Sequence, residues 1–232
     1  MIRQGTNIIW CKGCGLYSVF NSVNKILENE KAKVAVSGIG CSGRAAGYFD
    51  FDSANTLHGR AIPIAEGLKR ANEKLNVFVL SGDGDLLGIG LNHLIHCARR
   101  NTDLTVICMN NFIYGMTGGQ ASPTTEKGSI TKTSPRGMEF EPINAQGILI
   151  ANKKYFYART TPYNIEHLNE CLKKAFAHKG FSFVEVRGPC ITNARRILKK
   201  TIPEITKPYR DVKFVEENRI LEDDECGVNF RV

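Results

Sequence analysis

The sequence predicts an α/β domain in which a mainly parallel sheet is covered by helices on both faces. Two observations support this fold: short apolar runs alternate with segments of helical periodicity, and glycine-rich polar loops directly follow two of the apolar runs. Strands separated by helices pair in parallel, because the crossover helix returns the chain to the same end of the sheet. The predicted strands are residues 34–37, 77–81, 104–109, 155–159 and 181–187.

Four helices are predicted beside these strands. The helix after the second strand carries Leu87, Leu91 and Leu94 at intervals of three and four, which places them on one face. The last helix has Asn164 as its N-terminal cap and Gly180 as its stop. The helices are expected at residues 15–28, 60–72, 86–100 and 165–178.

The chain length allows one large domain with a buried core, although two small domains would also fit its 232 residues. We assign residues 1–190, which contain the predicted strands and helices, to one α/β domain. Residues 191–232 show little apolar periodicity and change from basic ARRILKK to acidic LEDDE. We expect this C-terminal extension to pack along another subunit or the domain surface. Residues 121–142, rich in Pro, Thr, Ser and Gly, fit either a flexible lid or a partner-docking loop.

Two polar loops follow the second and third predicted strands. After VFVLS comes Gly82-Asp83-Gly84, where the glycines let the backbone approach a phosphate while Asp83 presents a carboxylate. After TVICM comes Asn111, whose amide oxygen is a neutral ligand. Mg²⁺ takes about six oxygens but only one or two carboxylates, and phosphates supply several of the others. Because the loops of an open parallel sheet meet in one crevice, the sequence predicts a magnesium–diphosphate site.

The spacing of the two loops resembles the Gly-Asp-Gly…Asn signature of thiamine-diphosphate enzymes. A nicotinamide or flavin dinucleotide fold is the main alternative, because a glycine pair after a strand also occurs there. It fits less well, since the third glycine is Gly88 and the nearest acid, Asp103, precedes the next strand instead of ending it. A glycine turn without a ligand is the remaining alternative.

Four of the eight cysteines lie in glycine- or proline-rich turns, in CKGCG, GIGCSG and RGPC. These four are Cys11, Cys14, Cys41 and Cys190. Such a set suits a tetrahedral Zn²⁺ site or a [4Fe–4S] cluster, and CKGC alone suits a redox-active dithiol. Spacing alone does not choose among the three. We interpret Cys97, Cys108 and Cys171 as small buried hydrophobes, and Cys226 has no assigned role.

The chain starts with MIRQGTNIIW, which has no apolar signal-peptide core, and no run approaches the ~18 apolar residues of a membrane span. We therefore expect a cytoplasmic protein without membrane contact, in which disulfides do not form. The formal charge of +8 raises the alternative of a zinc-stapled basic module that binds nucleic acid. Lys and Arg are scattered and not interleaved with aromatic residues, so nucleic-acid binding is not expected.

Five motifs in this order resemble the beta subunit of 2-oxoacid:ferredoxin oxidoreductases. They are CKGCG, SGIGCSGR, TLHGRAIPIAEGLKRAN, SGDGDLLGIGLNHLIHCARRN and NNFIYGMTGGQASPTT. They cover residues 1–125 nearly continuously, and the later GPC extends the resemblance to Cys190. Several unlinked motifs in the right order are specific, although none is so by itself. The resemblance implies a thiamine-diphosphate-binding fold for residues 1–190, with loops that carry an iron–sulfur cluster.

The resemblance implies three cofactors: thiamine diphosphate, Mg²⁺ and one [4Fe–4S] cluster. The implied cluster ligands, which favour this cluster over Zn²⁺, are Cys11, Cys14, Cys41 and Cys190. The implied Mg²⁺ ligands are the side chains of Asp83 and Asn111 and the backbone carbonyl of Ile113. The residues expected to contact the cofactors are Gly40, Cys41, Ser42, His58, Gly82, Asp83, Gly84, Asp85, Asn111, Tyr114, Gly115, Met116 and Thr117.

The activity implied by the resemblance is the oxidative decarboxylation of a 2-oxo acid to acyl-CoA and CO₂. Electrons would pass one at a time through the cluster to ferredoxin, while coenzyme A captures the acyl group. The forms SGRAAGYF and YGMTGGQ are most like the 2-oxoglutarate branch of the family. The implied partners are ferredoxin and an alpha subunit, with or without small gamma and delta subunits. Coenzyme A and the 2-oxo acid would bind at the subunit interface.

Two side chains are candidates for direct roles in catalysis. Arg44, one turn from Cys41, could pair with the distal carboxylate of 2-oxoglutarate, although a solvated arginine or one beside the diphosphate fits equally well. His58 is placed near the diphosphate by the resemblance, and its alternative role is to cap the helix of residues 60–72. No loop offers an obvious glutamate to activate thiamine. Glu66 is a candidate by default, and we expect the alpha subunit to supply this group.

A non-oxidative thiamine-dependent decarboxylase or carboligase is the alternative within the same chemistry. Such an enzyme needs no set of four cysteines, so CKGCG, GIGCSG and RGPC argue against it. The two activities differ in whether electrons leave the site, which makes the cysteines the deciding feature.

Overall fold

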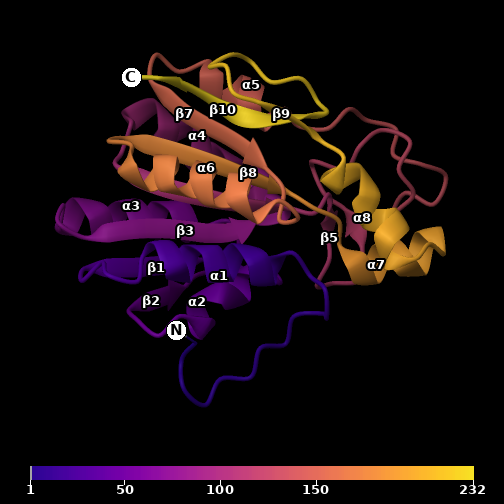
Figure 1. Cartoon of the computed structure of the whole chain (residues 1–232), viewed down its shortest axis with the longest axis horizontal. Coiled ribbons are helices and arrows are strands. Elements are labelled where there is room, and N and C mark those ends of the chain that lie inside the picture. The colour runs from indigo at the N-terminus through magenta and orange to yellow at the C-terminus, as the bar shows by residue number, and fades with distance from the viewer. Residues whose placement is uncertain (1) are drawn as a thin grey trace.

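The computed structural model describes residues 2–232 and contains one large mixed sheet. Its strands are β1 (Lys33–Ser37), β2 (Ser53–Asn55), β3 (Asn76–Gly82), β4 (Leu104–Asn110), β7 (Tyr155–Thr160), β8 (Phe181–Arg187), β9 (Lys213–Val215) and β10 (Glu225–Arg231). They lie in the order β2-β1-β3-β4-β8-β7-β10-β9, and the first six are mutually parallel (Figure 1). β10 runs antiparallel to β7, and β9 is parallel to β10. The predicted mainly parallel α/β fold is confirmed.

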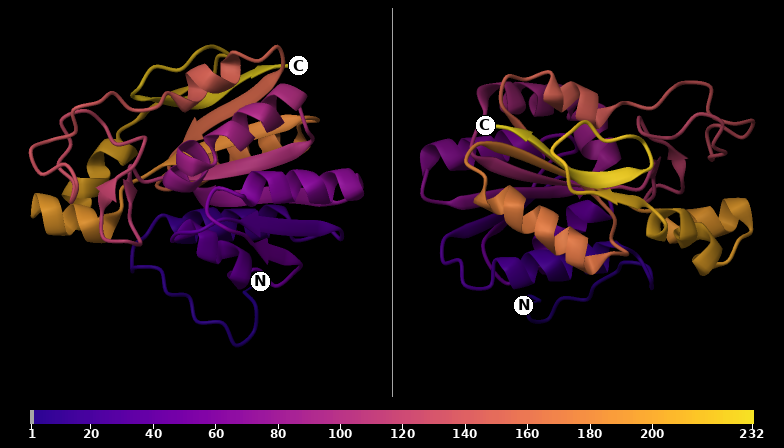
Figure 2. Two further views of the ribbon diagram at one scale, coloured as in Figure 1. Left: turned by 180° about the vertical axis from the view of Figure 1, so that it is seen from behind. Right: turned by 45° about the horizontal axis from the view of Figure 1, so that its top comes forward.

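Helices cover both faces of the sheet (Figure 2). On one face lie α1 (Leu16–Ile26), the short η1 (Ser42–Arg44) and α2 (Ala45–Tyr48), and α6 (Ile165–Ala177). On the other lie α3 (Ala61–Ala71), α4 (Leu91–Arg100) and α5 (Ala145–Ile150). Successive side chains of β3 point to opposite faces of the sheet. Phe78 and Leu80 therefore pack with the first group of helices, and Val79 packs with the second. No helix in residues 2–232 is long and apolar enough to cross a membrane.

Most predicted elements are present. The five predicted strands all form, and α1, α3 and α6 lie within two residues of their predicted bounds. The side chain of Asn164 caps α6 by accepting a hydrogen bond from the His167 amide. The predicted helix 86–100 is wrong as a single helix: a wide helical turn, η2 (Gly84–Ile89), precedes α4. The break lies at Gly88 (φ −92°, ψ −110°), where a Cβ would come within 2.9 Å of the Tyr114 hydroxyl.

The end of the chain joins the central sheet. From the sequence, residues 191–232 are expected to form an extension outside the α/β domain, whereas in the structure they form α7 (Ile191–Leu198), α8 (Ile202–Arg210), β9 and β10. Residues 227–231 of β10 pair with β7. Much of β10 is buried, but its buried positions include Glu225, Gly227 and Asn229, which are not apolar. This explains why apolar periodicity did not reveal β10.

The carboxyl ends of the parallel strands meet at one edge of the sheet, at the right of Figure 1, next to α7 and the small hairpin β5 (Ile113–Tyr114) and β6 (Gln120–Ala121). Register places Gly82 of β3 opposite Met109 of β4, and Asn110 of β4 opposite Arg187 of β8. The loops after these three strands therefore begin side by side.

Candidate functional site

The loops after β3 and β4 bring Asp83 and Asn111 together. The backbone N–H of Asn111 lies 3.4 Å from Asp83 Oδ1, and the hydroxyl of Thr124 donates to Asp83 Oδ2 at 2.8 Å. Asp83 is 2% exposed, and this burial raises the pKa of its carboxyl against the opposing effect of hydrogen bonds from Ser122 and Thr124. A cation beside Asp83 would offset the cost of burying its charge. The donor set fits Mg²⁺.

Tyr114 packs directly on the Asp83 loop. A Cβ on Gly84 would lie 2.2 Å from Tyr114 Cε1, so only glycine permits this approach. The Tyr114 hydroxyl also lies 3.4 Å from the carbonyl oxygen of Gly84. Asn111 Oδ1 accepts a hydrogen bond from the backbone N–H of Ile113, which shapes the turn into β5. The hairpin and the Asp83 loop thus form one packed unit around the candidate metal ligands.

Asp85 holds protein loops together. Its Oδ1 accepts hydrogen bonds from the backbone N–H of Gly59 (2.7 Å) and of Ile39 (3.2 Å), and its Oδ2 accepts one from Ser81 Oγ (2.7 Å). His58 Nδ1 lies 2.7 Å from Asp85 Oδ1, although the two atoms are not aligned for a hydrogen bond. The carboxylate of Asp85 is therefore engaged within the protein and ties the loops of Gly59 and Ile39 to β3.

His58 lies beside Tyr114, with ring centroids 6.2 Å apart. It does not cap the following helix, because α3 begins after Arg60 without a side-chain cap. The structure thus places His58 at the wall formed by Asp85 and Tyr114, close to the candidate diphosphate site, and excludes the alternative role given to it from the sequence.

The loop after β1 borders the same edge. Gly40 has φ +122°, a conformation that favours glycine, with open space where a Cβ would be. Ser42 Oγ would lie 3.0 Å from a Cβ on Gly82, so the two loops touch. Arg44 is exposed, and its guanidinium forms no hydrogen bond or ion pair with any of residues 2–232. Arg44 is thus available to an anionic group from outside the chain.

Four cysteines border one cavity of about 460 Å³ next to Asn111. They are Cys11, Cys14, Cys41 and Cys190, all free thiols. Other lining residues named from the sequence are Gly115, Met116 and Thr117. Within residues 2–232, no group of three or more His, Cys, Asp and Glu side chains is arranged to hold a single metal ion.

The environment of these thiols suits a soft metal centre. Burial, with a smaller contribution from repulsion by Cys190, Cys41 and Cys11, raises the pKa of Cys14 to about 11. Burial and the same repulsion raise the pKa of Cys41, with Arg44 opposing the rise. Thiolates bound to iron or zinc escape both penalties, because the metal neutralises their charge. Four thiols bordering one cavity are the donors that a [4Fe–4S] cluster uses, so this donor set fits [4Fe–4S].

A buried polar network that was not predicted from the sequence lies next to the loops of Asp83 and Asn111. Asn110 accepts a hydrogen bond from Thr124 and donates one to Glu185 Oε1 at 2.7 Å. Glu185 Oε2 is paired with Arg159 at 3.2 Å and with the hydroxyl of Tyr157. Burial alone would raise the pKa of Glu185, but the attraction of Arg159 prevails and lowers it. An acid inside the apolar strand FSFVEVR was the available signal, because a buried charge requires a partner.

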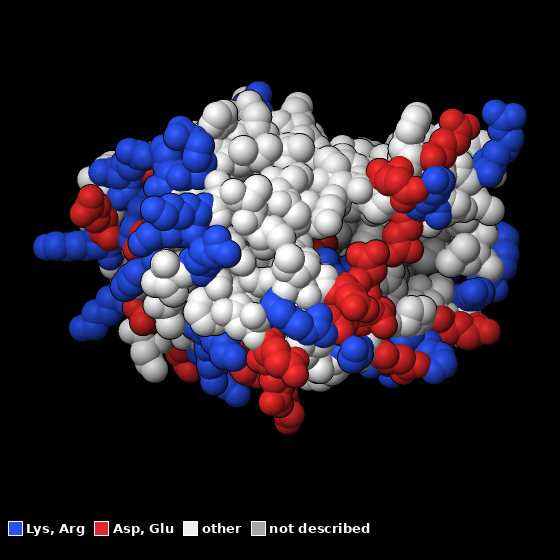
Figure 3. Space-filling view, turned by 90° about the horizontal axis from the view of Figure 1, so that it is seen from above, with Lys and Arg blue, Asp and Glu red and all other residues white. Residues whose placement is uncertain are grey.

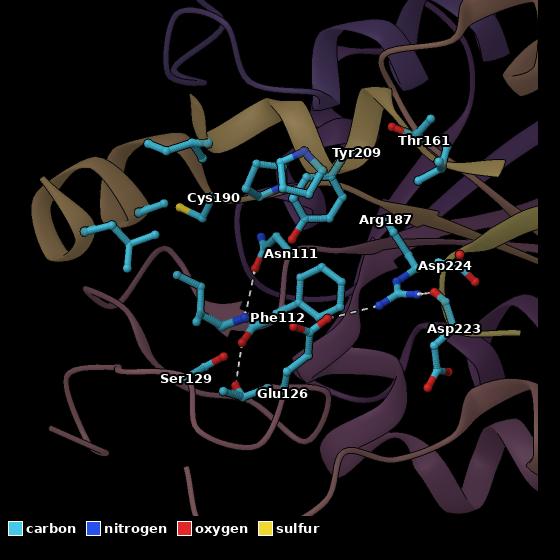
Figure 4. A pocket seen from close by; sticks show the side chains of 18 of the residues that line it. Asn111, Phe112, Glu126, Ser129, Thr161, Arg187, Cys190, Tyr209, Asp223 and Asp224 are labelled. Atoms are coloured by element: carbon cyan, nitrogen blue, oxygen red, sulfur yellow. Dashed lines mark hydrogen bonds and ion pairs between the residues drawn. The ribbon is translucent and has the colours of Figure 1, made fainter. Parts of the chain in front are cut away.

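A second cavity, of about 580 Å³, lies between the Asn111 loop, α7, α8 and the end of β8. Figure 4 shows Arg187 between Glu126 and Asp223, where it bonds the Glu126 carboxylate at 3.2 Å and the Asp223 carbonyl at 2.6 Å. Figure 3 shows one face of the molecule, on which acidic side chains border a hollow with Lys and Arg among them, whereas Lys and Arg predominate at the opposite end.

Glu66, named by default as the thiamine-activating acid, lies elsewhere. It forms ion pairs with Arg70 and Arg100 and accepts a hydrogen bond from Thr102 at 2.8 Å. Thr102 precedes β4, at the edge of the sheet opposite Asp83. The assignment of Glu66 to the site is therefore wrong, because its partners hold it against the turn between α4 and β4.

Comparisons with known proteins agree with this geometry. The profile of the C-terminal thiamine pyrophosphate-binding domain of thiamine pyrophosphate enzymes matches residues 38–186. The chain is 47% identical to 2-oxoglutarate synthase subunit KorB of Archaeoglobus fulgidus, over 90% of this chain and 76% of that protein. It is 44% identical to the KorB subunit of Methanothermobacter marburgensis, over 91% of this chain and 74% of that protein.

A solved structure extends the similarity to three dimensions. The 2-oxoglutarate:ferredoxin oxidoreductase from Magnetococcus marinus, with 2-oxoglutarate, coenzyme A and succinyl-CoA bound, has a TM-score of 0.87 to this chain and 29% identity. The match covers 100% of this chain and 84% of that chain. The fold, the two strand-end loops and these relatives agree, and the chain belongs to the thiamine diphosphate-binding beta subunits of the 2-oxoglutarate and other 2-oxoacid:ferredoxin oxidoreductases.

Proposed function

We propose that this chain, together with an alpha subunit, oxidatively decarboxylates 2-oxoglutarate to an acyl-CoA and CO₂ and delivers the electrons to ferredoxin. The observation that carries this proposal is the position of Asn111. Its backbone contacts Asp83 in the candidate Mg²⁺ site, and the same residue lines the cavity of the four cysteines. A coenzyme anchored at Asp83 would thus lie next to a one-electron acceptor, as oxidative chemistry requires.

The chain's own residues would hold each cofactor at this edge. Asp83, Asn111 and the carbonyl of Ile113 would bind Mg²⁺ and, through it, the diphosphate. Bound thiamine diphosphate supplies the electron sink that decarboxylation of a 2-oxo acid needs. Tyr114 and His58 would wall the site, and exposed Arg44 would orient the distal carboxylate of 2-oxoglutarate by a paired hydrogen bond.

The second half of the proposal concerns electron transfer. Cys11, Cys14, Cys41 and Cys190 would ligate a [4Fe–4S] cluster in the cavity beside Asn111. Each catalytic cycle releases two electrons, and the cluster would pass them on one at a time. We infer a cytoplasmic complex in which the alpha subunit supplies the acid that activates thiamine and, with this chain, the binding site for coenzyme A.

The test is an anaerobic assay of the complex purified with its alpha subunit. We expect a brown protein that reduces a viologen dye only when 2-oxoglutarate and coenzyme A are both present, with lower rates for pyruvate and branched oxo acids. Cys190→Ser should abolish dye reduction, and Cys171→Ala, a buried cysteine outside the cavity, should not.

The same assay separates the non-oxidative alternative. Release of CO₂ from 2-oxoglutarate without dye reduction, at a rate unchanged by Cys190→Ser, would assign the protein to simple decarboxylation. A colourless complex that contains stoichiometric zinc would reject the cluster.

A further inference from the structure

α7 begins at the cysteine cavity, and one of its side chains turns back toward a cysteine. Cys190 directly precedes the first turn of α7, and Asn193 follows within that turn. Asn193 is 4% exposed and lines the cavity. Its Nδ2 group donates hydrogen bonds to Cys190 Sγ at 3.3 Å and to the carbonyl oxygen of Gly115 at 3.1 Å. A buried amide therefore donates directly to one of the four sulfurs.

Two contacts determine which end of the amide faces the sulfur. The carbonyl oxygen of Gly115 can only accept a hydrogen bond, so the group 3.1 Å from it is the NH₂ of Asn193. The amide oxygen packs against Gly119, where a Cβ would lie only 3.0 Å from it. Gly119 has φ +94°, which favours glycine. The loop of residues 114–119 thus holds the NH₂ group on Cys190.

We propose that Asn193 raises the reduction potential of the cluster by donating a hydrogen bond to the Cys190 sulfur, an inference that rests on the cluster of the proposed function. On reduction the cluster gains one electron, which comes from oxidation of the 2-oxo acid and leaves to ferredoxin, and no bond at Cys190 breaks. The added negative charge resides partly on the sulfurs. A donor to sulfur stabilises this state more than the oxidised one, so the potential rises.

Other groups act on other sulfurs of the set: the backbone N–H of Leu16 bonds Cys14, and the charge of Arg44 acts on Cys41. Asn193 is the side chain that donates to Cys190. Among the described residues that line the cavity, Arg196 is the only charged one. It lies one turn further along α7, and its side chain is exposed, so water and salt screen its charge. The buried amide of Asn193 is not screened in this way. Asn193 is thus a positioning residue that acts through Cys190 rather than through the substrate.

The test is a redox titration of the whole complex, purified anaerobically and followed by the electron paramagnetic resonance signal of the reduced cluster. Asn193→Ala should lower the midpoint potential. A tenfold fall in the equilibrium constant for one-electron reduction corresponds to 59 mV. Asn193→Asp keeps the size of the side chain but replaces the donor by a negative acceptor, so its potential should fall at least as far. Asn169→Ala on α6, outside the cavity lining, is the matched control and should leave the potential unchanged.

Each other outcome is decisive. Equal potentials in wild type and Asn193→Ala would overturn the proposal, and a shift in Asn193→Asp alone would assign the effect to added charge and also overturn it. Loss of iron from both variants at an unchanged unfolding temperature would show that Asn193 is needed for assembly instead of tuning. A wild-type complex without an iron–sulfur signal would refute the proposed function itself, and with it this inference.

Discussion

Thr124 donates a hydrogen bond to Asp83 at 2.8 Å across 41 positions of sequence. The same hydroxyl lies 2.9 Å from Asn110 Oδ1, and its single proton is shared between the two acceptors. The candidate metal ligand is therefore oriented in part by a residue near the end of the NNFIYGMTGGQASPTT motif, 13 positions after Asn111.

Thr124→Val should reduce both stability and cofactor binding. The change removes one buried hydrogen-bond donor from Asp83 and Asn110. Asp83 keeps its contact with the Asn111 amide, and Asn110 keeps its bonds with Phe112 and Glu185. Loss of a buried donor of this kind costs about 1–3 kcal/mol. Urea denaturation and calorimetric titration with Mg²⁺-thiamine diphosphate would measure the two effects. Thr133→Val is the control, because the hydroxyl of Thr133 lies at the surface, and its effect should stay within about 0.5 kcal/mol. Equal losses in the two variants would contradict the role of Thr124.

Asp83→Asn should abolish activity without unfolding the protein. Burial raises the pKa of Asp83, so removing its charge relieves a desolvation cost and should leave the cofactor-free protein at least as stable. Loss of a charged metal ligand should lower activity by roughly 100-fold or more. Thermal unfolding and the thiamine content of the purified complex are the measurements.

Asp85→Asn should behave in the opposite way. An amide at position 85 cannot accept from Ile39, Gly59 and Ser81 with the strength of a carboxylate, so unfolding should occur at a lower temperature. If Asp83→Asn were the more destabilising of the two, the assignment of metal ligand and structural residue would be reversed.

Gly84→Ala should damage the site although it adds only one methyl group. Its Cβ would overlap the ring of Tyr114 at 2.2 Å, so the hairpin must move away from the Asp83 loop. We expect a loss of about 1–3 kcal/mol and weaker binding of Mg²⁺-thiamine diphosphate. Gly67→Ala offers a matched control, because this exposed helical position in α3 has open space and alanine should stabilise it by about 0.5–1 kcal/mol. A stabilising Gly84→Ala would refute the packing argument.

Arg159→Met should be strongly destabilising. Arg159 and Glu185 are 7% and 6% exposed, and removal of the arginine leaves a buried carboxylate without its counter-charge. Breaking such a pair typically costs about 3–5 kcal/mol. Adding Glu185→Gln should recover part of the loss in urea denaturation, because the uncompensated charge is then gone. A double variant less stable than Arg159→Met would contradict this reasoning.

The contribution of Glu66 to the free energy of unfolding should depend on pH. Hydrogen bonds from Arg100, Thr102 and Arg70 lower its pKa to about 2, against the opposing effect of burial. A carboxyl whose pKa is lower in the folded state stabilises the fold above its unfolded pKa of about 4.3, and this share is lost as the pH falls toward 2. Glu66→Gln should therefore cost roughly 1–3 kcal/mol at pH 7 and progressively less below pH 4. If the difference in free energy of unfolding between the wild type and Glu66→Gln stayed constant with pH, it would contradict the lowered pKa of Glu66.

The sequence predicted the elements that repeat a pattern. Asp83 and Asn111 could be placed at one edge because each directly follows an apolar strand, and parallel strands that lie side by side end together. The split of the predicted helix at Gly88 was not foreseeable, because the close neighbour of Gly88, the Tyr114 hydroxyl, comes from another loop. Neither was the difference between the two aspartates of GDGD, since only the fold shows that Asp85 turns inward to other loops.

Contacts made by irregular segments could not be predicted from the sequence either. Thr124 lies in a stretch without periodicity, so nothing marks it as a partner of Asp83 until the loop is folded. Glu185 and Arg159 are different, because each interrupts an apolar strand and a buried charge demands an opposite one. Their pairing could have been predicted from adjacent strands had the order β8-β7 been known.

Backbone pairing between β3 and β4 places Gly82 opposite Met109, so the loops of Asp83 and Asn111 start one interstrand distance apart, about 4.8 Å. That distance is common to all paired strands and does not depend on what the loops themselves contain. Mutagenesis libraries can therefore vary the surface around Arg44 in search of new oxo-acid preferences, while the distance between the starts of the Asp83 and Asn111 loops, the proposed anchor of the coenzyme, stays the same. Backbone hydrogen bonds in the sheet fix this distance, so a library that changes only the loops does not have to design it.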